Sequence, residues 1–179
     1  MVTKYNYKLS EDLFVAIESE FDGEAIAKKY VQTKDNSIFN DFGKNWMKKT
    51  LELGNQEQYM DHTYEMIKKV GEKTGQGLFP NGPQRFIEIA YLSVHLMSNV
   101  DIFTSNLQEL SFKVLKDQCK IYKNLESELP SDELKDLPCK GACMEALKIL
   151  FEDFKISVDL SMPHKMSIDS ECFFIAKKK

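Results

Sequence analysis

Hydrophobic residues in the first half of the chain recur every three or four positions, the spacing that aligns them on one side of an α-helix. Stretches with this spacing cover residues 10–30, 38–53, 55–71 and 83–97. Ser10 suits the cap of the first helix, Asp22-Gly23 breaks or re-caps it, and Gly54 ends the second. The last stretch is apolar almost all round, which favours a central buried helix and leaves a strand as the alternative.

The pattern changes near Leu110, where apolar and polar residues begin to alternate, as they do in a strand with one solvent-facing side. Alternation covers residues 112–122, with Asp117 as an interruption, and residues 154–160 and 172–176. Residues 123–138 have the composition of a charged loop, and helical spacing returns between Cys139 and Phe154. The last two strands are separated only by a turn over 163–170, so we expect them to pair antiparallel.

Helices followed by strand, helix and strand hairpin predict an α+β fold, with an N-terminal helical layer packed on a small antiparallel sheet. The 179 residues suit one domain, in which residues 1–104 form the helical layer and residues 105–179 form the strand–helix–hairpin part. Hydrophobic residues make up 42% of the chain and charged residues 29%, which is ordinary for a globular protein.

The net charge of −4 is spread along the chain, so we expect no nucleic-acid partner. No apolar run approaches the ~20 residues that span a bilayer, and the first eight residues lack an apolar signal core. These features predict a cytoplasmic protein without a membrane span. In that compartment cysteines are expected as thiols or metal ligands rather than disulfides.

All four cysteines lie in the second half of the chain. Cys119 ends a predicted strand, Cys139 and Cys143 are four residues apart on one helix, and Cys172 begins the last strand. His164 lies in the turn eight residues before Cys172. Strand ends and helix starts on one face of a small sheet can converge, so these side chains are candidates for one site.

Thiolate and imidazole ligands of this kind suit tetrahedral zinc, and soft sulfur ligands would also suit iron–sulfur. The candidate metal ligands are Cys119, Cys139, Cys143, Asp159, His164 and Cys172, with Glu171 as an alternative to Asp159. Core thiols that only fill space are the competing interpretation, because cysteine is among the most buried residue types. A third interpretation is a thiol hydrolase in which Cys139, at a helix start, is the nucleophile and His164 is the base.

The many Phe and Met residues, 12 and 8 of them, also permit an apolar pocket between the helices and the sheet. Tyr91, His95 and Trp46 are its candidate ligand-binding residues. For His95, a hydrogen-bonded core histidine and a ligand-contacting one are both open. His62, beside Asp61, is expected to be exposed.

Four features follow one another in the second half of the chain: the strand that ends in Cys119, the helix that begins at Cys139, the acid Asp159, and the final strand Glu171-Cys172-Phe173-Phe174-Ile175. This pattern resembles that of the 4-vinyl-reductase-like small-molecule-binding domains. These domains are kin to small subunits of the TRAPP vesicle-tethering complex. The resemblance covers roughly residues 105–177. His164 stands where sensor members have a further cysteine, and Asp159 lies near the acidic position of the family without coinciding with it.

The resemblance implies an α+β domain with an apolar ligand pocket and, in some members, zinc held by cysteines and an acid. The cysteine-containing strand ending is also similar to that of aminothiazoline-carboxylate hydrolases, which keeps a thiol- or zinc-dependent hydrolase open. The helix-then-sheet order also resembles the haem nitric-oxide-binding domains, with His95 as axial candidate, but their Tyr-x-Ser-x-Arg motif is absent.

The preferred expectation is a binding or sensor domain for a small hydrophobic molecule, with a zinc site rich in cysteine, and it allows for a homodimer. The alternatives are the hydrolase and a scaffold protein whose thiols belong only to the core.

Overall fold

The computed structural model describes residues 7–75 and 77–179. Of the N-terminal stretch used to argue against a signal peptide, residues 1–6 lie outside the described part. The α-helices are α1 (Glu11–Glu18), α2 (Gly23–Thr33), α3 (Ser37–Gly54), α4 (His62–Thr74), α5 (Asn81–Val94), α6 (Lys120–Glu128), α7 (Lys140–Asp153) and α8 (Met166–Asp169). The strands are β1 (Asp101–Ser105), β2 (Glu109–Leu115), β3 (Val158–His164) and β4 (Glu171–Lys178), and two 3₁₀ turns cover Glu57–Tyr59 (η1) and Glu133–Asp136 (η2).

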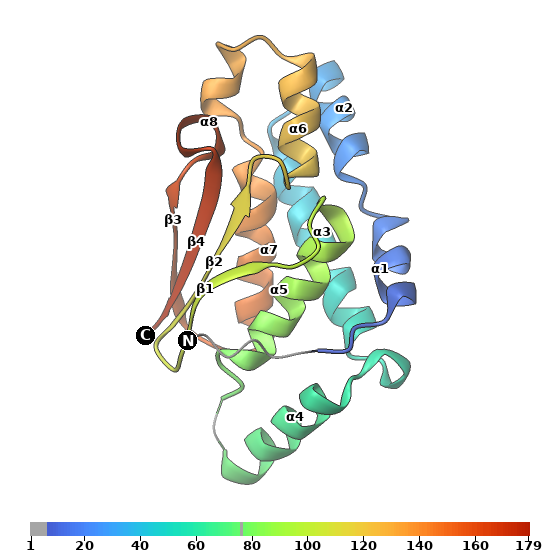
Figure 1. Cartoon of the computed structure of the whole chain (residues 1–179), viewed down its shortest axis with the longest axis vertical. Coiled ribbons are helices and arrows are strands. Elements are labelled where there is room, and N and C mark those ends of the chain that lie inside the picture. Colours follow the sequence, from blue (N-terminus) through green and yellow to red (C-terminus); the bar gives the residue numbers. More distant parts are fainter. Residues whose placement is uncertain (1–6, 76) are drawn as a thin grey trace.

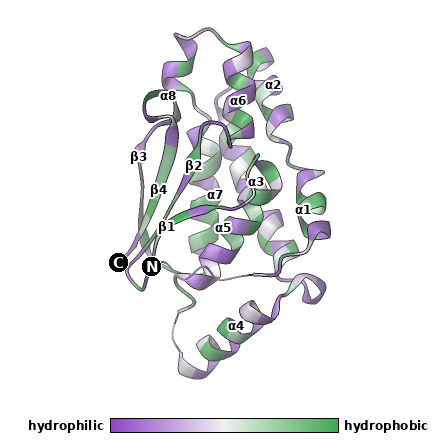
Figure 2. Ribbon diagram, viewed as in Figure 1, coloured by the Kyte–Doolittle hydropathy of each residue, from purple (hydrophilic) through white to green (hydrophobic). Residues whose placement is uncertain are grey.

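The four strands form one antiparallel sheet in the order β1-β2-β4-β3, and the helices cover one of its faces (Figure 1). The fold is therefore α+β, as the sequence pattern predicts. β4 lies inside the sheet, paired with β2 on one side and β3 on the other. Its ribbon is largely hydrophobic (Figure 2), as expected for an inner strand.

Side chains of β2 and β4 alternate between the two faces of the sheet. Phe112 pairs with Phe174 on the face toward the helices, where their rings stack at 5.0 Å and both are buried. Lys113 pairs with Phe173 on the opposite face, which is called the outer face below. α5 packs on the inner face through Tyr91, whose ring lies 5.0 Å from that of Phe112.

Behind this layer, α3 packs against α5 and very closely against α7. A Cβ added at Gly43 of α3 would overlap the carbonyl oxygen of Ala142 in α7. Glycine at this position lets the two helix backbones approach, which brings α7 and its cysteine next to α3.

Acidic caps start two of the helices. The Asp22 carboxylate accepts a hydrogen bond from the Glu24 amide at 3.0 Å, so Asp22-Gly23 re-caps the chain and begins α2 rather than only ending α1. Asp61 caps α4 in the same way through the Tyr64 amide at 2.9 Å. α4 therefore starts at His62, seven residues later than the spacing from residue 55 suggests.

The predicted strand over 112–122 is wrong in its second half. β2 ends at Leu115, and Cys119 is the N-cap of α6, its sulfur accepting from the Tyr122 amide at 3.4 Å. Ile121, Tyr122 and Leu125 are buried at helical spacing, so packing of α6 against α2 decides this segment. Asp117, which interrupts the alternation, lies in the intervening turn.

Five other features also differ from the sequence pattern. β1 follows the last predicted helix and begins inside the part assigned to the helical layer, where no strand was expected. α5 stops at Val94, leaving His95 as its C-cap in an extended conformation. The last hairpin starts only at Val158, because α7 continues to Asp153 and Lys155 takes a positive φ of 54°. The turn over 163–170 contains α8, and the charged loop over 123–138 contains most of α6 and η2.

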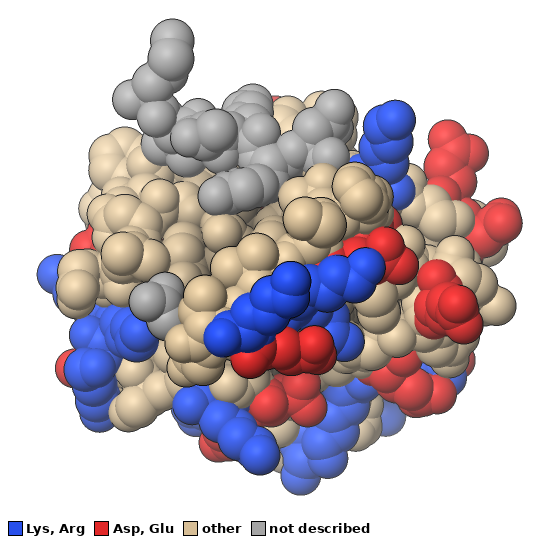
Figure 3. Space-filling model, turned by 90° about the horizontal axis from the view of Figure 1, so that it is seen from below, with Lys and Arg blue, Asp and Glu red and all other residues tan. Residues whose placement is uncertain are grey.

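Seen from below, lysines and acidic residues are interspersed on the surface (Figure 3). This side of the molecule therefore presents no field of a single sign, in agreement with the net charge of −4. Among the described residues, no helix combines the length and the apolar character needed to cross a membrane.

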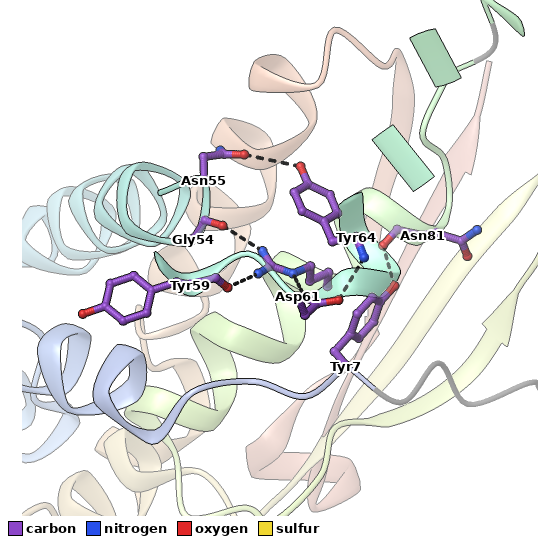
Figure 4. A network of polar contacts seen from close by, with 8 residues as sticks. Tyr7, Gly54, Asn55, Tyr59, Asp61, Tyr64 and Asn81 are labelled. Carbon is purple, nitrogen blue, oxygen red and sulfur yellow. Dashed lines mark hydrogen bonds and ion pairs between the residues drawn. The ribbon is translucent and has the colours of Figure 1, made fainter. Parts of the chain in front are cut away.

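α4, the lowest helix in Figure 1, is connected to the rest of the fold by the network of polar contacts drawn in Figure 4. Arg85 of α5 is fully buried and donates to the Asp61 carboxylate at 2.6 Å. It also donates to the carbonyl oxygens of Gly54 at 3.0 Å and Tyr59 at 2.8 Å. The Tyr64 ring covers the guanidinium at 4.4 Å, so one side chain joins α3, η1, α4 and α5.

Candidate functional site

The four cysteines gather between the helices and the inner face of the sheet. Cys119 caps α6, Cys139 precedes α7, Cys143 lies one turn further along α7, and Cys172 is on β4 opposite Val114. All four are free thiols. Neighbouring thiols influence one another's pKa, so the cysteines lie near one another, and Cys119 reaches this region from a helix cap instead of a strand end.

Burial is the largest influence on these thiols, and it raises the pKa of all four because it disfavours the charged thiolate. Neighbouring thiols add to the effect: Cys172 and Cys143 both raise the pKa of Cys139. The pKa of Cys172 is raised to about 11. The cluster is therefore neutral at physiological pH and behaves as a soft, weakly polar surface.

A pocket of about 260 Å³ opens beside Cys139 and Cys172. Its wall is mainly apolar, and one side opens to solvent. The side chains that form the apolar wall are Tyr122, Leu134, Leu137, Pro138, Met162 and Met166. The pocket thus lies where α6, η2, the start of α7, the end of β3 and α8 meet.

The sequence reasoning missed most of these wall residues, because it treated 123–138 as a charged loop and 163–170 as a turn. A usable signal was present. Leu134, Leu137 and Met166 are apolar residues inside segments otherwise rich in charge. Such residues in a polar segment often mark a place where the segment packs back on the fold.

Trp46, Tyr91 and His95, the three candidate ligand-binding residues, do lie together. The Trp46 ring centroid is 5.2 Å from that of Tyr91 and 5.9 Å from that of His95, and Tyr91 and His95 are 5.4 Å apart. All three are buried, at 0%, 0% and 6% exposure. None of them is part of the pocket wall.

This trio buries polar atoms that have no hydrogen-bond partner within the described protein: Trp46 Nε1, Tyr91 OH, His95 Nδ1 and His95 Nε2. The Cys143 thiol interacts with the Tyr91 hydroxyl and contributes to the raised pKa of Tyr91, which burial mainly causes, but the pair does not reach hydrogen-bond geometry. Burial also lowers the pKa of His95 to about 4, so its imidazole is neutral at physiological pH. The hydrogen-bonded core histidine considered above is therefore not what the structure contains.

His164 and Asp159 lie away from the cysteines. His164 pairs with Phe173 across the β3–β4 ladder, and Asp159 pairs with Lys177. Directly paired residues share a face of the sheet, so His164 lies on the outer face with Phe173, and Asp159 lies there with Lys177. Cys172 is next to Phe173 in β4 and therefore points to the inner face. The Asp159 side chain is 74% exposed and forms an ion pair with Lys179 at 2.8 Å.

On the outer face, His164 joins a separate polar and aromatic cluster. Its Nδ1 lies 2.5 Å from Glu171 Oε1, and Lys113 Nζ lies 3.1 Å from Glu171 Oε2. These two contacts lower the pKa of Glu171. The Lys113 ammonium also lies over the rings of Phe103 and Phe173, at 5.6 Å and 5.4 Å.

The structure therefore does not bring the sequence-derived zinc ligands together as one set. Within residues 7–75 and 77–179, no group of three or more His, Cys, Asp or Glu side chains is placed to hold a metal ion. A Cys139 nucleophile with a His164 base is not supported by this geometry either, because the base must reach the thiol and the thiol must ionise. Here the two residues lie on opposite sides of the sheet, and burial raises the pKa of Cys139. His62 starts α4 with its side chain 87% exposed, as expected.

Comparison with known proteins returned no match to a family model, to a curated protein or to a solved structure. The resemblance to the 4-vinyl-reductase-like domains and to the aminothiazoline-carboxylate hydrolases stays a prediction from the residues that carry it.

Proposed function

We propose that this chain is a small-molecule-binding or sensor domain whose hydrophobic ligand occupies the pocket beside Cys139 and Cys172. The observation that carries the proposal is a mainly apolar cavity of about 260 Å³ whose wall includes two half-buried, neutral thiols. Apolar walls with a few polar groups are typical of small-molecule sites. The volume is below the ~300–1,000 Å³ usual for drug-sized ligands, which favours a short chain or a single ring.

The proposal includes Trp46, Tyr91 and His95 as a polar inner end of the same region. Cys143 connects the two parts, since its thiol interacts with both Cys172 and Tyr91. A buried polar group without a partner costs about 1–3 kcal/mol, so four such atoms in one trio favour a role in which a polar group or water meets them.

The test is calorimetric titration of the whole chain with octanamide, a neutral molecule with an apolar tail. We expect saturable binding that Leu137→Trp weakens at least about tenfold, because the larger ring fills the pocket. Ile168→Trp is the matched control, since Ile168 is on α8, is 74% exposed and does not line the pocket. Equal binding of octanamide by both variants would contradict the proposal and favour the scaffold alternative.

Zinc remains a separate prediction that rests on the resemblance and the cysteine content. Elemental analysis of the purified protein measures it directly. Less than roughly 0.1 zinc or iron per chain, about the level of incidental binding, would remove the metal from the proposal without affecting the pocket.

A further inference from the structure

The rim of the pocket carries more positive than negative charge, although the whole chain has a net charge of −4. Three lysines line it, Lys135, Lys140 and Lys165, with Asp136 as the one acidic lining residue. Lys135 is engaged by Asp132 at 3.1 Å. Among the described residues, the ammonium groups of Lys140 and Lys165 have no ion-pair partner.

These two lysines line the pocket from different elements. Lys140 is the first residue of α7, and Lys165 separates β3 from α8. The beginning of α7 itself lines the pocket, and the start of a helix carries partial positive charge. Three features at the mouth of one apolar cavity therefore favour a negative group there.

Beneath the rim, the wall has no positively charged group to pair with an anion. Apart from the charged residues, the lining consists of aliphatic, methionine and proline side chains, one tyrosine, one serine and two thiols that burial keeps neutral. Because a buried charge without a partner is very costly, the charged end of a ligand has to stay at the mouth. Both lysines are exposed and flexible, so their ammonium groups can follow a ligand there.

We propose that the ligand is a small amphipathic anion: a carboxylate held at the mouth by Lys140 and Lys165, attached to an apolar body that fills the cavity. This inference rests on the proposed function and adds the chemical class of the ligand. The apolar body can be an acyl chain or an aromatic ring.

Two matched pairs of ligands test it, octanoate against octanamide and 4-propylbenzoate against 4-propylbenzamide. Within a pair the members have nearly the same size and shape and differ in charge. By calorimetry at low salt, the carboxylate is expected to bind about five- to tenfold more tightly than its amide in at least one pair, the size expected from two exposed ion pairs. The difference should shrink in about 0.5 M salt, which screens exposed charges.

The double variant Lys140→Gln/Lys165→Gln should reduce this preference to about twofold or less and leave the affinity for the amide unchanged. Lys69→Gln/Lys73→Gln is the control, because it removes the same charge from exposed positions on α4, outside this pocket. A preference equal to that of the unmodified chain in the Lys140/Lys165 variant, or a similar loss in the control, would overturn the inference.

The outcomes separate the two proposals. If amide and carboxylate bind equally well and Leu137→Trp blocks both, the pocket binds small molecules and the anion inference is wrong. If none of the four ligands binds, both proposals are wrong. If only the carboxylates bind, and Leu137→Trp has no effect on them, binding occurs elsewhere on the surface and both proposals are again wrong.

Discussion

His95 is only 6% exposed, and both of its ring nitrogens lack a hydrogen-bond partner among the described residues. A core selected only for stability would favour an apolar ring here, since an unpaired buried polar atom is destabilising. Tyr91 and Trp46, whose rings contact His95, also carry buried polar atoms without a hydrogen-bond partner among the described residues. Buried polar atoms without partners are typical of positions retained for function, which is why the trio is part of the proposed site.

The lowered pKa of His95 predicts a specific loss of stability in acid. The ordinary pKa is 6.5 and the folded-state pKa is about 4, because burial disfavours the charged imidazolium. Between these values the unfolded chain binds a proton that the folded chain does not, so the free energy of unfolding falls as the pH decreases through this window. Comparing urea unfolding at about pH 7 and about pH 4.5, the decrease should be about 2–3 kcal/mol smaller in His95→Phe than in the unmodified chain.

His62→Phe is the control for this measurement. His62 is exposed at the start of α4, so its replacement should leave the pH dependence as it is in the unmodified chain. The same acid sensitivity in His95→Phe and the unmodified chain would show that His95 is not the buried, neutral group described here.

Close contact between α3 and α7 determines where Cys143 and the start of α7 lie. Gly43 has room for no side chain, because a Cβ would overlap Ala142. Gly43→Ala should therefore lower the free energy of unfolding by about 1–3 kcal/mol, the usual cost of overpacking a core contact. Chemical denaturation measures it, with Gly77→Ala as control, since a Cβ at Gly77 meets nothing within 4 Å. Equal stability of both variants would mean that the two helices can separate without cost.

Elements with strong periodicity were predictable from the sequence, and elements decided by their neighbours were not. α3 and α5 carry long apolar stripes and were expected within a few residues of their ends. Residues 119–125 fit both an alternating and a helical period, and contact with α2 selects the helix. β1 has only five residues, and its pairing with β2 becomes visible only in three dimensions.

The candidate site was likewise predictable from the sequence only in part. The sequence predicted four cysteines in one region, because strand ends and helix starts were expected at one side of the sheet. It did not foresee that His164 and Cys172 lie on opposite faces, since that depends on the register of His164 with Phe173. The register contains an irregularity between Ser161 and His164, which local alternation does not reveal.

At the scale of the whole molecule, Arg85 connects the helical layer to α4. Removing its guanidinium in Arg85→Met leaves the Asp61 carboxylate buried without its partner and leaves two carbonyl groups unsatisfied. We expect a loss of about 3–5 kcal/mol in the free energy of unfolding, the usual cost of breaking a buried ion pair. The measurement is chemical denaturation followed by circular dichroism.

Lys28→Met provides the comparison, because it breaks the ion pair with Glu24 on the exposed surface of α2 and should change stability little. If Arg85→Met were as stable as Lys28→Met, α4 would have to be held by its apolar contacts alone.

β4 separates two chemical environments with a single backbone. Cys172 faces the thiol cluster, while Glu171 and Phe173 on either side of it face the part-buried cluster around Lys113 on the outer face. Sliding this strand by one position against its partners would turn a carboxylate and an aromatic ring inward and expose the sulfur. A one-residue shift of β4 would therefore be destabilising on both faces of the sheet. The side chains on both faces thus favour the observed register.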